Sequence, residues 1–400
     1  MRITAVKIFH NTLRSICGNF LELFSRIWSL DKKSLVFIPS TREPFSGNTW
    51  ALFEFIVEKR PDYKVVYFIN DRQLMKALNL KYGCEMFYFS GSFSAMLLAA
   101  RSGAWITYDL PLHFYLLSIF KNPKRMVYYL GHGIPLKRIA LASRNVSFLR
   151  ILNRYLLVSC YSHILGFSTS IIPVMKEAFG HSGKEFFPVG QPRLDSRHES
   201  NVILDLNKIL CRSSNPRIVL YAPTWRYHKS TEFFPFENFC IEKLNSFLEM
   251  NNIFIFLRPH GKKPFDLPLS LLSSDHVKMF DSFTFPDVNA YLDQFNALVT
   301  DYSSIFFDFL VHDRPVGFIP YDYNEYEENP GFGIEYYKFT PGKKIHTFDD
   351  FLRFLGQIDD DGYSIDRARV VSDLNIKNNS NCEENLSVID EWFRDKDCGI

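Results

Sequence analysis

Residues 126–138 read MVYYLGHGIPLKR, an apolar run that ends in a Gly-His-Gly turn and is followed by two basic residues. Continuous apolar character is typical of strands that are buried on both faces of a parallel sheet. In open parallel α/β sheets, ligands bind beyond the carboxyl ends of the strands. The glycines permit a tight turn, and we expect His132 to point into a cleft, where an imidazole is a natural general base. A lone histidine in a turn is nevertheless more often structural.

The same pattern continues on both sides of this stretch. Helical segments such as Thr49–Lys59 and Cys240–Asn251 alternate with apolar runs and give a succession of βαβ units. The polar region Gly190–Asn215 has no strand signal and separates two such series. The predicted strands are Ser34–Ser40, Lys64–Asn70, Ala104–Thr107, Met126–Leu130, His163–Phe167, Arg217–Ala222, Ile253–Leu257, Ala297–Thr300 and Pro315–Ile319.

The sequence therefore predicts an α/β protein with two Rossmann-like domains whose parallel sheets face each other across a cleft. We expect an N-terminal domain over 31–195, a C-terminal domain over 196–375 and a C-terminal helix over 376–400. Residues 1–30 mix basic and apolar side chains, so an amphipathic helix on a membrane face and a core-packed helix both stay open. No apolar run approaches the roughly 20 residues that span a bilayer, and we recognise no signal peptide.

The distribution of charge points to an anionic partner for one half of the chain. The 400 residues carry 46 basic and 44 acidic side chains, but residues 1–200 hold 26 basic and 13 acidic ones. Since no nucleic-acid motif is present, we expect an anionic membrane or phosphate-polymer surface and no nucleic acid. The candidate acceptor or membrane residues, which follow the apolar stretch Leu112–Phe120, are Lys137, Arg138, Arg144, Arg150 and Arg154.

Composition excludes several other classes. A hydrophobic content of 46% with 22% charged residues fits a folded globular protein and excludes general disorder. Seven scattered cysteines without a CxxC pair indicate reduced thiols instead of a disulfide framework or a zinc site. The chain has no GxxxxGK[ST], GxGxxG or HExxH motif. We therefore expect no metal and no cofactor.

Four further turns carry candidate side chains. GQPRLD at 190–195 offers Arg193, which could reach a phosphate, although a plain linker turn is the stronger interpretation from the sequence alone. YAPTWR at 221–226 presents a hydroxyl, a ring and a cation at a strand end, which suits a nucleotide or a phosphate. LRPHGKK at 257–263 is either an anion site or a solvated basic turn. TDYSSIFFDF at 300–309 places two serines at a helix start, which is a phosphate site or an ordinary cap.

Together, in this order, the five turns resemble the CDP-glycerol:polyglycerophosphate glycerophosphotransferases, the family of teichoic-acid primases and polymerases. The resemblance spans roughly residues 34–365. It implies a GT-B-type fold and attack of an acceptor hydroxyl on the β-phosphorus of CDP-glycerol, with release of CMP. It also implies a lipid-linked acceptor of teichoic-acid or capsule type and a peripheral location on the cytoplasmic face of the membrane.

The resemblance assigns roles residue by residue. His132 would be the catalytic base, and His260 with Arg258 would contact the diphosphate. The remaining donor-binding positions would be Gly133, Pro135, Arg193, Thr224, Trp225, Arg226, Ser303, Ser304 and Asp308.

Three alternatives stay open. The chain departs from the family pattern at Ile134, at Tyr227-His228 and at Glu328–Phe332, so ribitol phosphate or another polyol phosphate could replace glycerol phosphate. A GT-B glycosyltransferase that uses a nucleotide sugar would share the fold and the phosphate-binding groups. A non-catalytic protein that binds a membrane or a polyanion could also have kept the fold.

Overall fold

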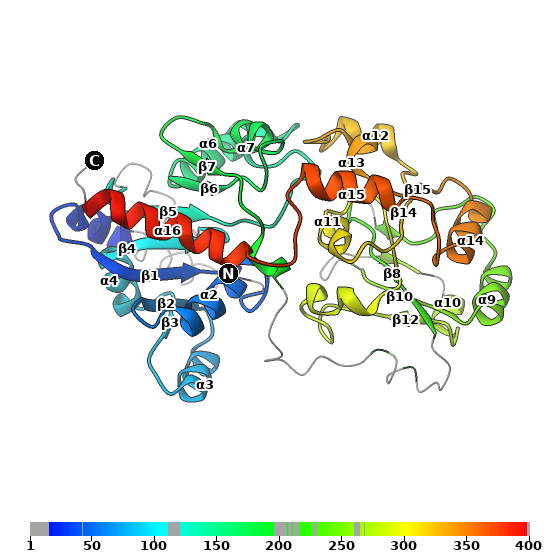
Figure 1. Ribbon diagram of the computed structural model, residues 1–400, viewed down its shortest axis with the longest axis horizontal. Coiled ribbons are helices and arrows are strands. Elements are labelled where there is room, and N and C mark those ends of the chain that lie inside the picture. The colour runs from blue at the N-terminus through cyan, green and yellow to red at the C-terminus, as the bar shows by residue number, and fades with distance from the viewer. Residues whose placement is uncertain are drawn as a thin grey trace, which may run out of the picture. The chain divides into compact units, whose positions relative to one another are not determined.

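The computed structural model describes residues 16–41, 43–110, 121–195, 206, 210, 216–226, 230–259, 265–267 and 269–397. The chain forms two compact units (Figure 1). The first unit comprises Met1–Gly133, Ile139–Ser196 and Lys377–Ile400, and the second comprises Ile134–Arg138 and Arg197–Ile376.

The first unit is built on a seven-stranded parallel sheet with the order β3-β2-β1-β4-β5-β6-β7. A described helix lies in every connection between consecutive strands except the one from β4 to β5, part of which lies outside the described residues. The strands are β1 (Asp31–Ile38), β2 (Lys64–Ile69), β3 (Phe87–Phe89), β4 (Ser102–Thr107), β5 (Met126–Tyr129), β6 (His163–Leu165) and β7 (Glu185–Phe187). The helices include α2 (Gly47–Lys59), α3 (Arg72–Tyr82), α4 (Phe93–Arg101), α6 (Phe148–Val158), α7 (Ile172–Phe179), the 3-10 turns η2 (Ala140–Ala142) and η3 (Pro192–Leu194), and α16 (Asn381–Asp397).

The second unit has a six-stranded sheet with the order β12-β10-β8-β13-β14-β15, also parallel, and a small pair of strands, β11-β9. Its strands are β8 (Arg217–Tyr221), β9 (Thr231–Glu232), β10 (Ile253–Leu257), β11 (Phe265–Asp266), β12 (Val277–Met279), β13 (Ala297–Thr300), β14 (Val316–Phe318) and β15 (Lys343–Lys344). Its helices include α9 (Ile241–Met250), α10 (Leu269–Leu272), η4 (Val288–Gln294), α11 (Ile305–Phe309), η5 (Leu310–His312), α12 (Tyr323–Glu328), α13 (Tyr336–Phe339), α14 (Phe348–Gly356) and α15 (Ser364–Asp373).

The nine predicted strands are confirmed, and so are the helices predicted over Thr49–Lys59 and Cys240–Asn251. The sequence analysis missed the strands at both edges of both large sheets, β3, β7, β12 and β15. Each of these strands has only two or three residues. An edge strand pairs on one side only and stays short, so it leaves no apolar run that could be detected.

The C-terminal helix α16 packs in the first unit, against α2 and η3, although it follows the whole second unit in sequence (Figure 1). Asp195 anchors its start by accepting hydrogen bonds from the backbone N–H groups of Asn381 (3.0 Å) and Cys382 (2.7 Å). At Gly190, a Cβ would lie 1.6 Å from Asn381 Oδ1, so only glycine fits beside the helix. Two residues of the 190–195 turn thus hold the C-terminal helix in place.

The abundant aromatic residues form the cores. In the second unit, Tyr221 contacts Phe233 and Phe234 with ring centroids 5.1 Å and 5.2 Å apart, and Phe234 contacts Phe351 edge-on. Edge-to-face packing of this kind adds to the free energy of burial. The high phenylalanine content is therefore used for core packing.

Residues 16–25 form a helix in which one face is buried and the other carries apolar side chains to the surface. Glu22 and Ser25 are buried, whereas Phe20, Leu23 and Phe24 are exposed. Of the helices that the structure describes, none is long and apolar enough to cross a membrane.

Candidate functional site

The turn that follows β5 presents His132 between two glycines with left-handed backbone angles. Gly131 has φ of 55° and Gly133 has φ of 114°, both in the left-handed region. A Cβ would meet the Tyr129 ring at 2.5 Å from position 131 and the Arg193 guanidinium at 2.3 Å from position 133. Between the two glycines, His132 is exposed, and its ring lies 4.0 Å from that of Tyr108.

Side chains from two other segments hold this turn. Arg193 Nη1 donates a hydrogen bond to the carbonyl oxygen of His132 (2.8 Å). Asn48, fully buried near the start of α2, donates from Nδ2 to the Leu130 carbonyl (3.0 Å) and accepts from the Arg193 backbone N–H (3.3 Å). The histidine backbone is therefore fixed while its imidazole stays accessible, which is what an oriented general base needs.

In the second unit, the motif at 221–226 is organised around a buried arginine. Arg226 donates to Asp322 from Nε (2.8 Å), to Asp301 from Nη2 (2.9 Å) and to the Thr224 carbonyl from Nη1 (2.6 Å). Burial alone would lower the pKa of Arg226, but the two aspartates outweigh burial and raise the pKa above its ordinary value. Its cation also lies 5.2 Å from the centroid of the Tyr302 ring. The donors of Arg226 are thus committed to the protein itself.

Two hydroxyl groups beside this arginine are buried without a hydrogen-bond partner among the described residues. They belong to Thr224, whose backbone N–H donates to Asp301 Oδ1 (2.7 Å), and to Tyr302. A buried hydroxyl without a partner costs free energy. A ligand oxygen at Thr224 would remove that cost, so Thr224 is the stronger donor-binding candidate of the motif.

Residues 134–138 belong to the second unit. Lys137 pairs with Phe332 in an isolated β-bridge, and the Arg138 backbone N–H donates to the Gly331 carbonyl (2.9 Å). The Lys137 ammonium lies 5.9 Å from the centroid of the Trp225 ring. The pKa of Lys137 is lowered from its ordinary value, because burial and the Arg226 cation outweigh the attraction of Asp301. The structure therefore places Lys137 beside Trp225, which the sequence order does not suggest.

The remaining candidates of the second unit have mixed surroundings. The Arg258 guanidinium donates to the carbonyl groups of Phe285 (2.8 Å) and Phe280 (3.3 Å). Ser304 precedes the five-residue helix α11 as its N-cap and makes no side-chain capping bond, Ser303 is half-buried beside it, and Asp308 is buried within the helix. His260 lies outside the described residues, as do Lys262, Lys263 and Tyr227-His228.

The basic residues of the first unit surround a helix with an unusual surface. In α6, only Val158 is buried, and Phe148 and Leu149 are 76% and 75% exposed. Arg150 lies on the same helix and Arg144 just before it, both exposed, while Arg154 Nη1 donates to the Ala140 carbonyl (3.0 Å). An apolar surface next to arginines is typical of helices that lie on an anionic membrane. The apolar stretch Leu112–Phe120 lies outside the described residues.

Sequence reasoning missed three of the residues that build these turns. Asn48 lies just before the predicted helix Thr49–Lys59 and carries no motif, and Tyr108 follows a predicted strand without one. Asp322 is 96 residues from Arg226, its ion-pair partner. The sequence does not reveal these pairs, because the partners lie far apart along the chain. A polar residue close to the end of an apolar run is the one local signal.

Comparison with known proteins gives a consistent result. A family model described as CDP-Glycerol:Poly(glycerophosphate) glycerophosphotransferase matches residues 20–382. A teichoic acid glycerol-phosphate transferase of Staphylococcus aureus is 26% identical over 379 residues, which cover 90% of this chain and 93% of that protein. A teichoic acid ribitol-phosphate polymerase of the same organism is 28% identical over 204 residues, 50% of this chain and 36% of that protein.

A solved structure of a wall teichoic acid polymerase has the same fold. It superimposes with a TM-score of 0.73 at 19% sequence identity and covers 98% of this chain and 99% of that one. The predicted α/β, GT-B-like fold with two Rossmann-like domains is confirmed.

Proposed function

This chain belongs to the CDP-glycerol:poly(glycerophosphate) glycerophosphotransferase family, and from that premise we propose that it transfers glycerol phosphate from CDP-glycerol to a hydroxyl group of a lipid-linked teichoic-acid-type polymer. The observation that carries this proposal is the presentation of His132. An exposed imidazole is fixed on a turn that two glycines shape and that Arg193 and Asn48 hold. An exposed imidazole on a fixed backbone is well placed for proton transfer, whereas an exposed side chain adds little to the stability of the fold.

The reaction balances with His132 as the base. The acceptor hydroxyl oxygen attacks the β-phosphorus of CDP-glycerol, and its proton passes to the imidazole. The bond between that phosphorus and the oxygen bridging to the cytidylate breaks, and CMP leaves with the bonding electrons. A phosphodiester remains on the polymer. Because phosphoryl transfer depends on positioning and on neutralisation of charge, the protein needs cations around the diphosphate.

We assign the donor to the second unit. Thr224 has a buried hydroxyl without a partner among the described residues, and the Lys137 ammonium lies beside the Trp225 ring. Asp301, the carboxylate that acts on Lys137, is already bound by Arg226. The positive charge of Lys137 is therefore available to a phosphate. In this proposal Arg226 holds the motif together, Lys137 neutralises the donor, and Arg258, His260, Ser303, Ser304 and Asp308 are further donor-side residues.

The acceptor side belongs to the first unit, at the membrane surface. Phe148 and Leu149 would enter the interfacial layer while Arg144 and Arg150 pair with anionic headgroups. This surface supports a peripheral location on the inner face of the membrane, where a lipid-linked acceptor would be within reach.

The decisive experiment compares two exposed histidines of the first unit. Replacing His132 by Ala should lower the rate of CMP release from CDP-glycerol by at least about a hundredfold, the usual effect of removing a general base. The matched variant His181→Ala should keep the rate, because His181 is exposed but lies outside the turn. Equal rates for the two variants would rule out the catalytic role and favour a non-catalytic polyanion-binding protein.

A donor screen with the same assay separates the chemical alternatives. We expect CMP release with CDP-glycerol. Turnover with CDP-ribitol alone would move the chain to ribitol-phosphate transfer, to which the similar ribitol-phosphate polymerase points. Turnover only with a nucleotide sugar would refute phosphoryl transfer.

Sedimentation with liposomes tests the membrane surface. The variant Leu149→Ser should bind anionic liposomes more weakly than the unaltered protein, and binding should fall at high salt. The control is Leu80→Ser, because Leu80 in α3 is 85% exposed and lies outside α6. An equal loss for both variants would contradict a specific role for α6.

A further inference from the structure

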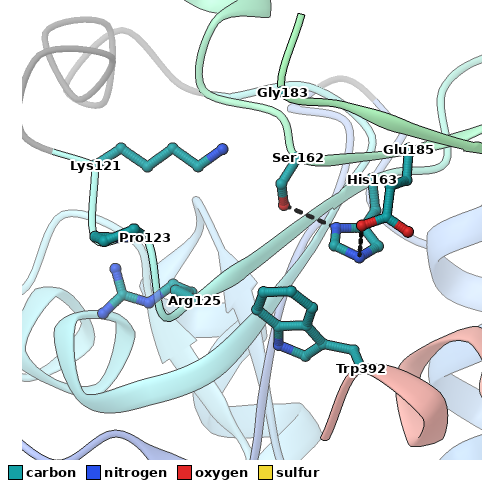
Figure 2. Close-up of a pocket in the computed structure, with 8 residues that line it drawn as sticks. All are labelled: Lys121, Pro123, Arg125, Ser162, His163, Gly183, Glu185 and Trp392. Carbon is teal, nitrogen blue, oxygen red and sulfur yellow. Dashed lines mark hydrogen bonds and ion pairs between the residues drawn. The ribbon is translucent and has the colours of Figure 1, made fainter. Parts of the chain in front are cut away.

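A cavity of about 500 Å³ opens at the amino ends of β5, β6 and β7 in the first unit (Figure 2). Its polar lining consists of Lys121, Arg125, Ser162, His163, Glu185 and Trp392. Arg125 directly precedes β5, and His132 follows it. The cavity therefore lies at the amino ends of the strands, whereas the histidine turn lies beyond their carboxyl ends. Its volume falls in the range of about 300–1,000 Å³ that is usual for pockets that hold whole small molecules.

The first feature of the lining is His163, a buried histidine whose ring is held by its neighbours. His163 is 3% exposed, and its Nδ1 lies 2.9 Å from Ser162 Oγ, which itself accepts a hydrogen bond from the Val127 backbone N–H (2.9 Å). The ring stacks on Phe187 and meets Trp392 edge-on, with centroids 4.9 Å apart. With Nδ1 engaged by Ser162, Nε2 is the nitrogen that faces the cavity, 3.9 Å from a carboxylate oxygen of Glu185.

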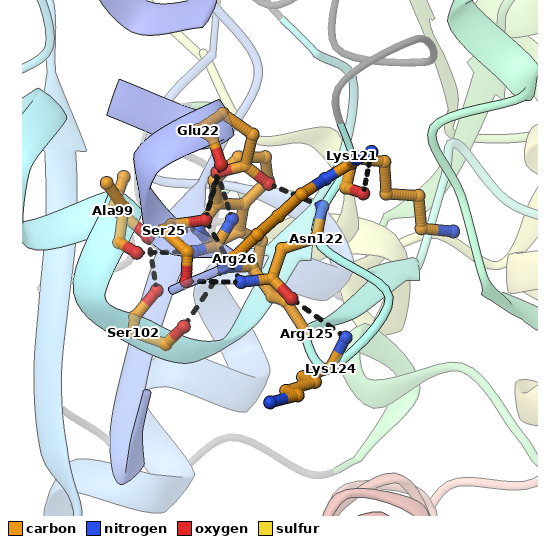
Figure 3. A network of polar contacts seen from close by, with 11 residues as sticks. Glu22, Ser25, Arg26, Ala99, Ser102, Lys121, Asn122, Lys124 and Arg125 are labelled. Atoms are coloured by element: carbon orange, nitrogen blue, oxygen red, sulfur yellow. Dashed lines mark hydrogen bonds and ion pairs between the residues drawn. The ribbon is translucent and has the colours of Figure 1, made fainter. Parts of the chain in front are cut away.

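The second feature is Lys121, which makes no ion pair with the residues that the structure describes. Figure 2 shows the Lys121 side chain extending along the cavity. The neighbouring Glu22 is bound by Arg125, which also donates to the carbonyl groups of Ser102 and Ala100 (Figure 3). The pKa of Lys121 is lowered to about 8, because burial, helped by the ammonium of Lys184, outweighs the attraction of Cys160 and Glu22. An anion in the cavity would favour the charged form of Lys121 and so raise its pKa.

The third feature separates a bare anion from a larger ligand. Glu185 stands at the edge of the cavity with its side chain 67% exposed, and it would repel a bare phosphate. A carboxylate instead accepts hydrogen bonds from hydroxyl groups. Trp392 adds a ring surface against which C–H groups can pack. The cavity therefore combines a cation, a carboxylate and an aromatic wall.

We propose that this cavity binds a polyol phosphate, with the phosphate on Lys121 and His163, the polyol hydroxyls on Glu185 and the carbon chain against Trp392. The site lies away from the transfer turn and goes beyond the proposed reaction. Two sources share this chemistry, a polyol-phosphate unit of a soluble chain and the glycerol-phosphate headgroup of a phospholipid.

The N-terminal helix suggests how a headgroup could reach the cavity. Arg26, just after the helix at residues 16–25, donates from Nη2 to the Lys121 carbonyl (3.0 Å), so the end of the helix lies beside the Lys121 turn (Figure 3). The exposed apolar side chains of the same segment are Ile16, Phe20, Leu23, Phe24 and Ile27. They give an apolar surface to the segment whose Arg26 contacts the Lys121 carbonyl.

The first test measures binding without any transfer reaction. The probe is glycerophosphoglycerol, titrated by calorimetry into the full chain, with glycerol and inorganic phosphate as partial ligands. We expect glycerophosphoglycerol to bind more tightly than either. The variant Lys121→Gln should weaken this binding at least about tenfold, the loss expected for one charge-assisted hydrogen bond. The matched variant Lys124→Gln should not, because Lys124 is exposed and outside the lining.

Three results would overturn the proposal. They are the absence of binding, equal binding by both lysine variants, and phosphate alone binding as tightly as glycerophosphoglycerol. Heat-capacity or hydrogen-exchange measurement of Lys121→Gln shows that the variant is folded, which keeps a loss of binding interpretable.

A second experiment identifies the source and separates this site from the proposed function. Loss of binding to phosphatidylglycerol vesicles in Lys121→Gln, compared with Lys124→Gln, would identify the headgroup. Unchanged vesicle binding together with loss of the soluble probe would identify the free chain. His132→Ala should bind glycerophosphoglycerol normally while transfer is lost, so failure of one proposal leaves the other testable.

Discussion

Each unit contains a buried arginine, and the two are neutralised differently. Arg125 in the first unit is 1% exposed, and among the described residues its carboxylate partner is Glu22; its other donors meet backbone carbonyls (Figure 3). Arg226 in the second unit is 8% exposed and faces two carboxylates, Asp301 and Asp322. In both arginines, each of the three guanidinium nitrogens donates at least one hydrogen bond.

The direction of the pKa shift follows the number of carboxylates. Burial lowers the pKa of Arg125 more than Glu22 raises it. At Arg226 two aspartates outweigh burial and raise the pKa. The pKa of Lys121, whose neighbouring carboxylate Glu22 is bound by Arg125, is lowered to about 8, mainly by burial. Of these three cations, only Arg226, which two carboxylates bind, has its pKa raised.

The largest expected effect is on the second unit. Arg226→Met leaves Asp301 and Asp322 buried without their cation, so we expect the free energy of unfolding of this unit to fall by about 3–5 kcal/mol. Native-state hydrogen exchange of β8 and β13 measures it. Adding Asp301→Asn and Asp322→Asn to the variant should restore part of the loss, because the uncompensated charges are then removed. Unchanged hydrogen-exchange protection in Arg226→Met would contradict a stabilising role for these ion pairs.

A smaller loss is expected in the first unit. Arg125→Met strands one carboxylate, Glu22, and the free energy of unfolding should fall by about 3 kcal/mol. Hydrogen exchange should show lost protection over residues 16–25, because Glu22 is their buried anchor, and unchanged protection in β8. Glu22→Gln serves as the milder control. A loss of protection in both units would contradict the local character of this ion pair.

The third prediction concerns pH. Because the pKa of Lys121 is about 8 in the folded chain and ordinarily 10.5, the unfolded chain binds the extra proton between these values. The free energy of unfolding should therefore rise as pH increases from 8 to 10.5, by about 1–2 kcal/mol after allowance for partial exposure. The measurement is the difference between the unaltered chain and Lys121→Met in urea denaturation at each pH. A constant difference across this range would refute the shift.

The smallest effect on stability is expected at a third arginine. Arg193 is half-buried and donates to the His132 carbonyl, so Arg193→Lys should change the free energy of unfolding by less than about 1 kcal/mol. The rate of CMP release should nevertheless fall about tenfold, because the catalytic turn loses its support. KM for CDP-glycerol should stay unchanged, since the donor is assigned to the second unit. A raised KM with an unchanged rate would assign Arg193 to the donor instead, as the family resemblance implies.

Much of the fold could be predicted because buried parallel strands have a local signature. Runs such as Ile253–Leu257 are apolar on both faces, so composition alone reveals them. The edge strands escaped because two or three residues that pair on one side need no such run. The five turns were detectable because glycine, proline and charged residues directly after an apolar run are local features as well.

The construction of the site could not be predicted in the same way. Asn48 and Leu130 are 82 residues apart, and Arg125 and Glu22 are 103 residues apart. Burial selects such pairs, because a polar group away from water needs a partner wherever the fold supplies one. The 190–195 turn shows the same point. Its Arg193 supports the histidine turn, whereas Gly190 and Asp195 hold α16, and one motif thus has two structural tasks.

The sequence by itself determined the class of fold, the strands of both sheet interiors, the order of the five turns and, through them, the family. These properties depend on neighbours along the chain. Tertiary structure alone decided that Arg226 is a buried clamp, that residues 134–138 belong to the second unit and that Lys121 lines a cavity beside a neutralised Glu22. Charge and hydrogen bonding act through space over a few ångströms, so a residue's role depends on which distant segments the fold brings to it.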